Sequence, residues 1–224
     1  MCAVIGVCLE SVQQRDLELV RSLFLQSMVR GKHATGLTFF KDGKLNTIKK
    51  PISAKEFVDK YYFEDFVDDG RLLLIGHTRY STSDLRYNQP FQSEDLAIAH
   101  NGVISQDPDV WEYETETAND SELILRCIEH KHHPLDVYKN RSMAVVVLSE
   151  GKIHAFRNHE RPLWVANRKN GVVFSSTKNI LKRSGITEGV SQCEPLVEYS
   201  FGPSQVELTV DRSHFDPNIQ DLQP

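Results

Sequence analysis

The sequence contains no long apolar run and no recognisable secretory signal. None of its hydrophobic stretches approaches the roughly 20 residues that a helix needs to cross a bilayer. The first ten residues, MCAVIGVCLE, lack the basic stretch that opens a secretory signal. We therefore expect a cytoplasmic protein with no membrane partner.

Cysteine is scarce, and positive charge is not in excess. The four cysteines include no CxxC pair, which argues against a disulfide framework and against a thiolate metal site. The 26 basic and 31 acidic residues give a formal net charge of -5, so the chain offers no broad positive surface to a nucleic acid. We expect no metal, no cofactor and no nucleic-acid partner.

Repeats, low-complexity tracts and Pro/Gly-rich linkers are also missing. A length of 224 residues suits one substantial core. The sequence therefore predicts one domain over residues 1–211. Residues 212–224 are polar and lack periodicity, which predicts a tail or a strap over the surface.

The apolar patterns predict an α+β fold with antiparallel sheet and flanking helices. Helical spacing predicts amphipathic helices over 15–28 and 120–130, and Ser53 is expected to cap a helix that runs through Phe57. Asp42-Gly43 and Glu150-Gly151 predict the turns of two hairpins. Strands are predicted at 3–9, 35–40, 44–50, 72–80, 96–104, 142–148, 152–157, 163–166, 172–176, 196–201 and 206–210.

Cys2 opens the first predicted strand. The commoner role of such a cysteine is that of a small buried hydrophobe. If Met1 is removed, however, Cys2 carries the chain's α-amine, whose ordinary pKa of about 7.7 to 8.0 suits it to accept the thiol proton near neutral pH. Nucleophile and base are then one residue, and we expect little activity in a chain that retains Met1.

Arg79 lies where an apolar strand gives way to a loop. A guanidinium matches a carboxylate in bidentate geometry, so Arg79 is suited to hold the α-carboxylate of an amino acid, with the Thr82 hydroxyl beside it. The plainer alternative is a surface arginine.

Two further motifs admit a structural and a functional interpretation. Asn101-Gly102 interrupts a predicted strand as a hairpin turn, or it forms an oxyanion hole from the Asn101 amide and the Gly102 backbone N–H. Asp120 begins a predicted helix, where it either caps the helix or binds an ammonium group. With Cys2 and Arg79, these groups form the set needed to attack the side-chain amide of a free amino acid.

The combined motifs resemble those of the class II glutamine amidotransferases, members of the N-terminal nucleophile hydrolase superfamily. Some segments are most similar to the glutaminase domain of the phosphoribosylpyrophosphate amidotransferases, and others are also similar to glucosamine-6-phosphate synthases. The matching segments occur in the family's order: Cys2 with its strand, Arg30-Gly31 ahead of Gly36, Gly76-His77-Thr78-Arg79-Tyr80, Gln89-Pro90-Phe91, His100-Asn101-Gly102 and Asp120-Ser121-Glu122.

The resemblance implies a four-layer αββα sandwich and the hydrolysis of L-glutamine to glutamate and ammonia through a Cys2 γ-glutamyl thioester. It implies that Asn101 and Gly102 form the oxyanion hole. The substrate's α-groups would be held by Arg79, Thr82 and Asp120, and the matched motifs supply Arg30, His77 and His100 as supporting residues.

The chain departs from the family's pattern at His33, where members commonly carry an aspartate. No synthase motif occurs in these 224 residues, so the ammonia acceptor is expected on a separate synthase subunit. Two alternatives remain open at this point. One is an amide hydrolase or γ-glutamyl transferase that acts on another amide, and the other is a noncatalytic regulatory module of the same fold.

The segment His130-Lys131-His132-His133 contains imidazoles of the kind that bind zinc. It follows the end of a predicted helix, where positive charge suits the helix dipole. We interpret it as a solvated helix terminus.

Overall fold

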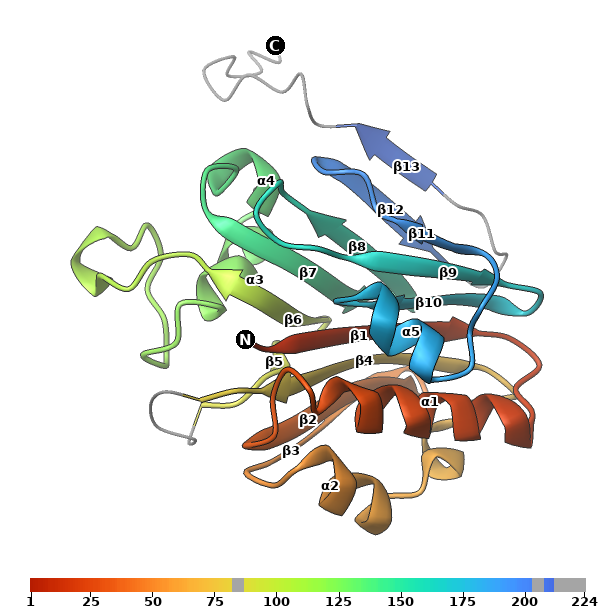
Figure 1. Cartoon of the computed structure of the whole chain (residues 1–224). Coiled ribbons are helices and arrows are strands. Elements are labelled where there is room, and N and C mark those ends of the chain that lie inside the picture. The colour runs from red at the N-terminus through yellow and green to blue at the C-terminus, as the bar shows by residue number, and fades with distance from the viewer. Residues whose placement is uncertain (82–86, 203–207, 212–224) are drawn as a thin grey trace.

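Two antiparallel sheets form the centre of the molecule (Figure 1). The structure is a computed structural model that describes residues 1–81, 87–202 and 208–211. The first sheet has the strand order β11-β9-β10-β1-β4-β2-β3, and the second has the order β13-β12-β8-β7-β6-β5. The strands are β1 (Ala3–Leu9), β2 (Ala34–Lys41), β3 (Lys44–Lys50), β4 (Leu72–Arg79), β5 (Phe91–Gln92), β6 (Leu96–Val103), β7 (Ser142–Ser149), β8 (Lys152–Arg157), β9 (Trp164–Arg168), β10 (Gly171–Ser175), β11 (Val190–Gln192), β12 (Val197–Phe201) and β13 (Leu208–Asp211).

Helices cover the outer face of each sheet, which makes four layers. On the first sheet lie α1 (Gln14–Ser27), α2 (Ala54–Lys60) and α5 (Lys178–Arg183), and on the second lie α3 (Glu122–Glu129) and α4 (Pro134–Val137). Two short 3-10 helices occupy Phe63–Phe66 and Pro108–Val110. The predicted α+β fold and αββα layering are confirmed.

Alternation along β1 assigns its side chains to the two faces of the first sheet. Ile5 and Val7 pack in the cluster under α1, together with Phe24. Val4 and Cys8 belong instead to the cluster between the two sheets. The core is therefore divided into layers that separate the central strands from solvent on both faces.

Local sequence explains the turns and one helix start. Asp42 and Gly43 both have positive φ between β2 and β3, and Glu150 and Gly151 do the same between β7 and β8. Both hairpin predictions are confirmed. The Ser53 side chain accepts a hydrogen bond from the Glu56 backbone N–H and so caps α2, as predicted.

The interpretation of Asn101-Gly102 as a hairpin turn is wrong. The ladder between β6 and β7 runs without a break from Leu96 and Ser149 to Val103 and Ser142. Other differences are small elements without a clear sequence pattern: β5, β11, α4 and α5. The predicted tail at 212–224 lies outside the described residues, and no helix in the described ranges is both long and apolar enough to span a bilayer.

Candidate functional site

A cavity of about 610 Å³ opens at the end of the sandwich where β1 begins and where β4 and β6 end. Ala3 pairs with Thr78, so Cys2 continues β1 beside Arg79. On β6, Ala97 and Ala99 face the space between the sheets, and alternation places Asn101 on the same face. Cys2, Arg79 and Asn101 all line the cavity.

Cys2 is half-buried at the mouth of a central strand. Its Sγ lies 3.9 Å from the Tyr80 carbonyl oxygen, and Arg30 Nε donates to the Cys2 carbonyl at 2.7 Å. Because β1 is paired with β10 on one side and β4 on the other, the backbone that leads to Cys2 is fixed. Arg30 therefore holds the backbone of the candidate nucleophile through this hydrogen bond.

Met1 occupies part of this cavity. Its sulfur lies 3.6 Å from a terminal nitrogen of Arg30 and 3.9 Å from one of Arg161. Removal of Met1 would take this side chain out of the cavity lining and make the Cys2 nitrogen the α-amine of the chain.

Asn101 combines deep burial with an unused donor. Only 2% of the residue is exposed, and its amide nitrogen Nδ2 has no hydrogen-bond partner among the described residues. A buried amide donor without a partner costs about 1–3 kcal/mol. An oxygen of a bound molecule would satisfy this donor, because Asn101 lines the cavity.

Gly102 is required by the close approach of two strands. A Cβ at this position would collide with the Ser142 carbonyl oxygen and lie 2.6 Å from His100 Nε2. Glycine therefore allows β6 to pair with β7 up to its end and keeps the 101–102 backbone at the cavity wall.

His100 lines the cavity and belongs to a closed hydrogen-bond network. Its Nε2 bonds to the Ser142 carbonyl at 3.2 Å, so that nitrogen carries the proton, and Nδ1 then accepts from Ser121 Oγ at 2.9 Å. Ser121 Oγ accepts from Gln89 Nε2 at 3.0 Å, and Gln89 Oε1 accepts the His100 N–H at 2.6 Å. Burial lowers the pKa of His100, which keeps it neutral as this network requires.

Arg79 is not a surface arginine. It is 9% exposed, and one terminal nitrogen donates to the Tyr87 carbonyl at 2.7 Å and to Asn88 Oδ1 at 2.9 Å. These bonds fix the guanidinium at the cavity wall. The other predicted anion-binding residue, Thr82, lies outside the described residues.

Asp120 does not cap α3, so that interpretation is wrong. The helix has Ser121 at its N-cap position, whereas Asp120 Oδ2 accepts the backbone N–H groups of Ile104 and Ser105 at 2.6 and 3.1 Å. The carboxylate also lines the cavity. It therefore joins the segment after β6 to the start of α3 and supplies negative charge to the cavity.

His77 lies on the cavity side of β4 and is 1% exposed. Burial, followed by the neighbouring His100 and Arg79, lowers the pKa of His77 to about 3, so the ring is neutral. No described group bonds to its Nε2.

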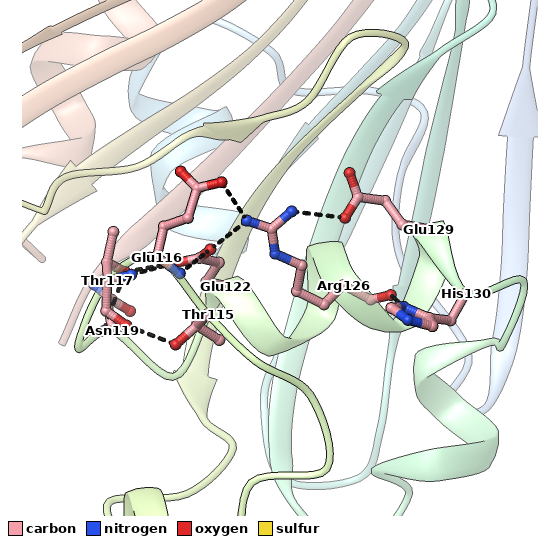
Figure 2. Close-up of polar contacts among 8 residues, drawn as sticks. All are labelled: Thr115, Glu116, Thr117, Asn119, Glu122, Arg126, Glu129 and His130. Atoms are coloured by element: carbon pink, nitrogen blue, oxygen red, sulfur yellow. Dashed lines mark hydrogen bonds and ion pairs between the residues drawn. The ribbon is translucent and has the colours of Figure 1, made fainter.

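The segment between β6 and α3 forms one wall of the cavity and is tied to α3 (Figure 2). Glu122 accepts the N–H groups of Glu116 and Thr117 at 2.8 and 2.9 Å and an ion-pair contact from Arg126 at 2.8 Å. Burial raises the pKa of Glu122, but these bonds outweigh burial and hold the pKa below its usual value. Arg126 also pairs with Glu116 and Glu129, as Figure 2 shows.

His33 supports the backbone just after β4. Its Nδ1 accepts the Ser81 backbone N–H at 2.9 Å, and its ring packs on Tyr80 with centroids 4.9 Å apart. A carboxylate at this position would also offer an acceptor, so the departure from the family's pattern preserves that chemical capacity.

The histidine segment ends α3 and begins α4. His130 and His132 are exposed, in agreement with a solvated terminus, whereas His133 is half-buried. His133 Nδ1 accepts the Leu135 N–H and caps α4, and its Nε2 lies 3.2 Å from Glu198. The described residues contain no group of three or more His, Cys, Asp or Glu side chains placed to hold a metal.

Arg161 lines the cavity although no sequence motif pointed to it. It lies in the loop between β8 and β9, and an arginine in a predicted loop is ordinarily a solvated side chain. No local pattern indicates that this loop returns to the N-terminus. Trp111 also lines the cavity, although the sequence assigns it no role.

Solved structures share this architecture. Glutamine phosphoribosylpyrophosphate amidotransferase from B. subtilis, complexed with ADP and GMP, matches 96% of the chain with a TM-score of 0.71 and 21% identity. The chain shares the fold of the glutamine amidotransferases. An allosteric regulatory enzyme of purine biosynthesis matches this amidotransferase fold with a TM-score of 0.72 and 20% identity, also over 96% of the chain.

The chain spans 50% of the length of each of these two chains. A glutamine aminotransferase class-II domain protein from Silicibacter pomeroyi matches over 94% of the chain and 99% of its own length, with a TM-score of 0.57 and 10% identity. No protein-family model matches the sequence, and no curated protein matches it. The likeness to the amidotransferases is therefore one of fold.

Proposed function

We propose that this chain is a glutaminase that hydrolyses L-glutamine to glutamate and ammonia, with Cys2 as nucleophile after Met1 is removed. The observation that carries the proposal is the buried Asn101 amide nitrogen without a described partner, which lines the same cavity as Cys2. A pre-formed donor beside a thiol is what an acyl-transfer site needs to stabilise an oxyanion.

The proposed first half-reaction begins when the α-amine of Cys2 accepts the thiol proton. Sγ attacks the δ-carbon of glutamine, and the resulting oxyanion binds the Asn101 amide and the Gly102 N–H. The tetrahedral intermediate collapses, the C–N bond breaks, and the α-amine returns the proton to the leaving group. Ammonia departs and a γ-glutamyl thioester remains on Cys2.

In the second half-reaction, water attacks the thioester while the α-amine accepts a proton from it. The C–S bond breaks, Sγ regains the proton, and glutamate is released. The cavity lining carries both a positive and a negative side chain, which fits a free amino acid. Arg79 would bind the α-carboxylate and Asp120 the α-ammonium, with Thr82 proposed as a further contact.

We also propose that the ammonia acceptor binds outside residues 1–211, on a synthase partner. The support is that the amidotransferase and the regulatory enzyme matched above are each about twice as long as the region that matches this chain. The test is co-purification of a partner that turns glutamine-dependent glutamate release into amidation of a second substrate.

The glutaminase itself is tested by glutamate release from glutamine, after mass spectrometry of the intact chain has established loss of Met1. Asparagine, glutathione and simple amides serve as competing substrates, because Cys2 and Asn101 would serve any acyl transfer. Cys2→Ala should abolish this turnover. Cys8→Ala is its matched control, because burial raises the pKa of the Cys8 thiol to about 11 and makes it inert. A preference for another amide would refute the substrate, and no turnover of any amide would refute the enzyme.

A further inference from the structure

Two guanidinium groups lie at the N-terminal end of the chain, beside the Met1 side chain, and that of Arg161 lies in the same cavity lining as Cys2. Arg30 and Arg161 both contact the Met1 sulfur, at 3.6 and 3.9 Å, although one follows α1 and the other follows β8. Arg30 is also bonded to the Cys2 carbonyl. Removal of Met1 takes away the side chain that both groups contact and leaves Arg161 in the lining of the cavity where Cys2 would begin the chain.

Arg161 is held rigidly. Its Nε donates to Ser142 Oγ at 2.5 Å, and its own carbonyl accepts from Arg157 at 3.3 Å. Arg157 is buried and also donates to the Cys193 carbonyl at 2.6 Å. The loop thus presents the remaining guanidinium nitrogens of Arg161 to the cavity, which it lines.

The charges of Arg30 and Arg161 influence each other. Burial lowers the pKa of Arg30, and repulsion from Arg161 lowers it further. An α-amine on Cys2, which shares the cavity lining with Arg161 and is bonded to Arg30 through its carbonyl, would be repelled by their charge on gaining a proton. A negative charge on Cys2 acts in the opposite sense and raises the pKa of Arg30.

We infer that Arg161 is a positioning residue that acts through charge, keeping the α-amine of Cys2 neutral so that this amine can accept the thiol proton. The inference rests on the proposed function for its catalytic consequence, but its effect on the reactivity of Cys2 is independent of glutamine. The other charged and titratable groups around the cavity are Arg79, His77 and Tyr80 on or after β4, Tyr87 before β5, and His100 and Asp120. Asp120 is the acidic member of this set and is tied to Ile104 and Ser105.

The first measurement is the pH dependence of Cys2 alkylation by iodoacetamide, read by mass spectrometry of the N-terminal peptide in full-length protein without Met1. In Arg161→Gln, the rate profile should move to higher pH by on the order of half a unit to one unit. Arg161→Lys keeps the charge and should remain near wild type. Arg183→Gln, an exposed position on α5, is the matched control and should not move the profile.

The second measurement is the pH profile of kcat/KM for glutamine. Its acidic limb should move in the same direction in Arg161→Gln, with a smaller shift in Ser142→Ala, which removes only the tether. An unchanged alkylation profile in Arg161→Gln would overturn the inference, as would an equal shift in Arg161→Lys. A shifted alkylation profile without glutamine turnover in any variant would refute the proposed glutaminase and leave the role of Arg161 intact. Retention of Met1 in the purified protein would overturn both.

Discussion

The two faces of the end of β6 differ in how their polar groups are satisfied. On the face toward α3, His100 belongs to a closed network with Gln89, Ser121 and Ser142. On the face between the sheets, Asn101 keeps its amide nitrogen unpaired among the described residues. Consecutive residues thus differ: the His100 side chain is fixed by partners, whereas the Asn101 donor, which has no described partner, fits its proposed role toward a ligand.

The largest effect is expected for Cys2→Ala, which removes the proposed nucleophile from the cavity that Asn101 also lines. Glutaminase activity should be lost, by at least about 10³-fold, because no other described cavity residue supplies both thiol and α-amine. The midpoint of denaturant unfolding should stay near that of wild type. Substantial residual turnover in a steady-state assay would show that Cys2 is not the nucleophile.

Asn101→Ala should lower kcat by about 10²–10³-fold while KM changes little, because the proposed donor acts on the oxyanion. Stability should be unchanged or higher, since the variant removes a buried donor that has no described partner. Initial-rate kinetics and urea unfolding measure the two effects. Asn46→Ala, at an exposed position on β3, provides the matched control.

Ser121→Ala examines the opposite face. The variant removes the hydroxyl that joins Gln89 to His100 and should lower the free energy of unfolding by about 1–3 kcal/mol. Its loss of kcat should be smaller than that of Asn101→Ala. If Ser121→Ala damaged kcat more and stability less than Asn101→Ala, the contrast between the two faces would be wrong.

The smallest effect is expected at Glu122, the first residue of α3, which covers the outer face of the second sheet. Its folded pKa lies below the unfolded value of about 4.3, so its stabilisation is complete above that value and is lost as the pH falls through the folded pKa. Glu122→Gln should therefore be less stable than wild type at pH 7, with a gap that narrows below about pH 4.5. Thermal unfolding from pH 3 to pH 7 measures the gap, and a gap independent of pH would contradict the prediction.

Local sequence patterns predict the parts of the fold that depend on neighbouring residues. The hairpin turns at 42–43 and 150–151, the Ser53 cap and the central strands follow from such patterns. The continuation of β6 through Asn101-Gly102 does not follow from a local pattern. It depends on Ser142, which lies on a strand 40 residues later in the chain and approaches so closely that only glycine fits at position 102.

The same limit applies to the site. Arg79, Asp120 and Asn101 were identified as candidates, and the structure brings them together with Cys2. The presence of Arg161 in the cavity was not predicted. Its placement depends on hydrogen bonds of its loop with Arg157 and Ser142, and the spacing of residues in the sequence does not reveal these bonds. The sequence also left open whether Asp120 caps α3 or faces the cavity. The hydrogen bond from the Ile104 N–H to its carboxylate shows that it does not cap the helix.

The start of β1 has a practical consequence for anyone who produces this protein. The strand is clamped between β4 and β10 from its first residues, so additional chain ahead of Cys2 must pass through or beside the cavity, as Met1 does. A purification tag fused at the N-terminus should therefore yield a folded but silent protein until a protease leaves Cys2 as the first residue. Maturation by an aminopeptidase would act as the on-switch, and the choice of tag would decide whether activity is seen at all.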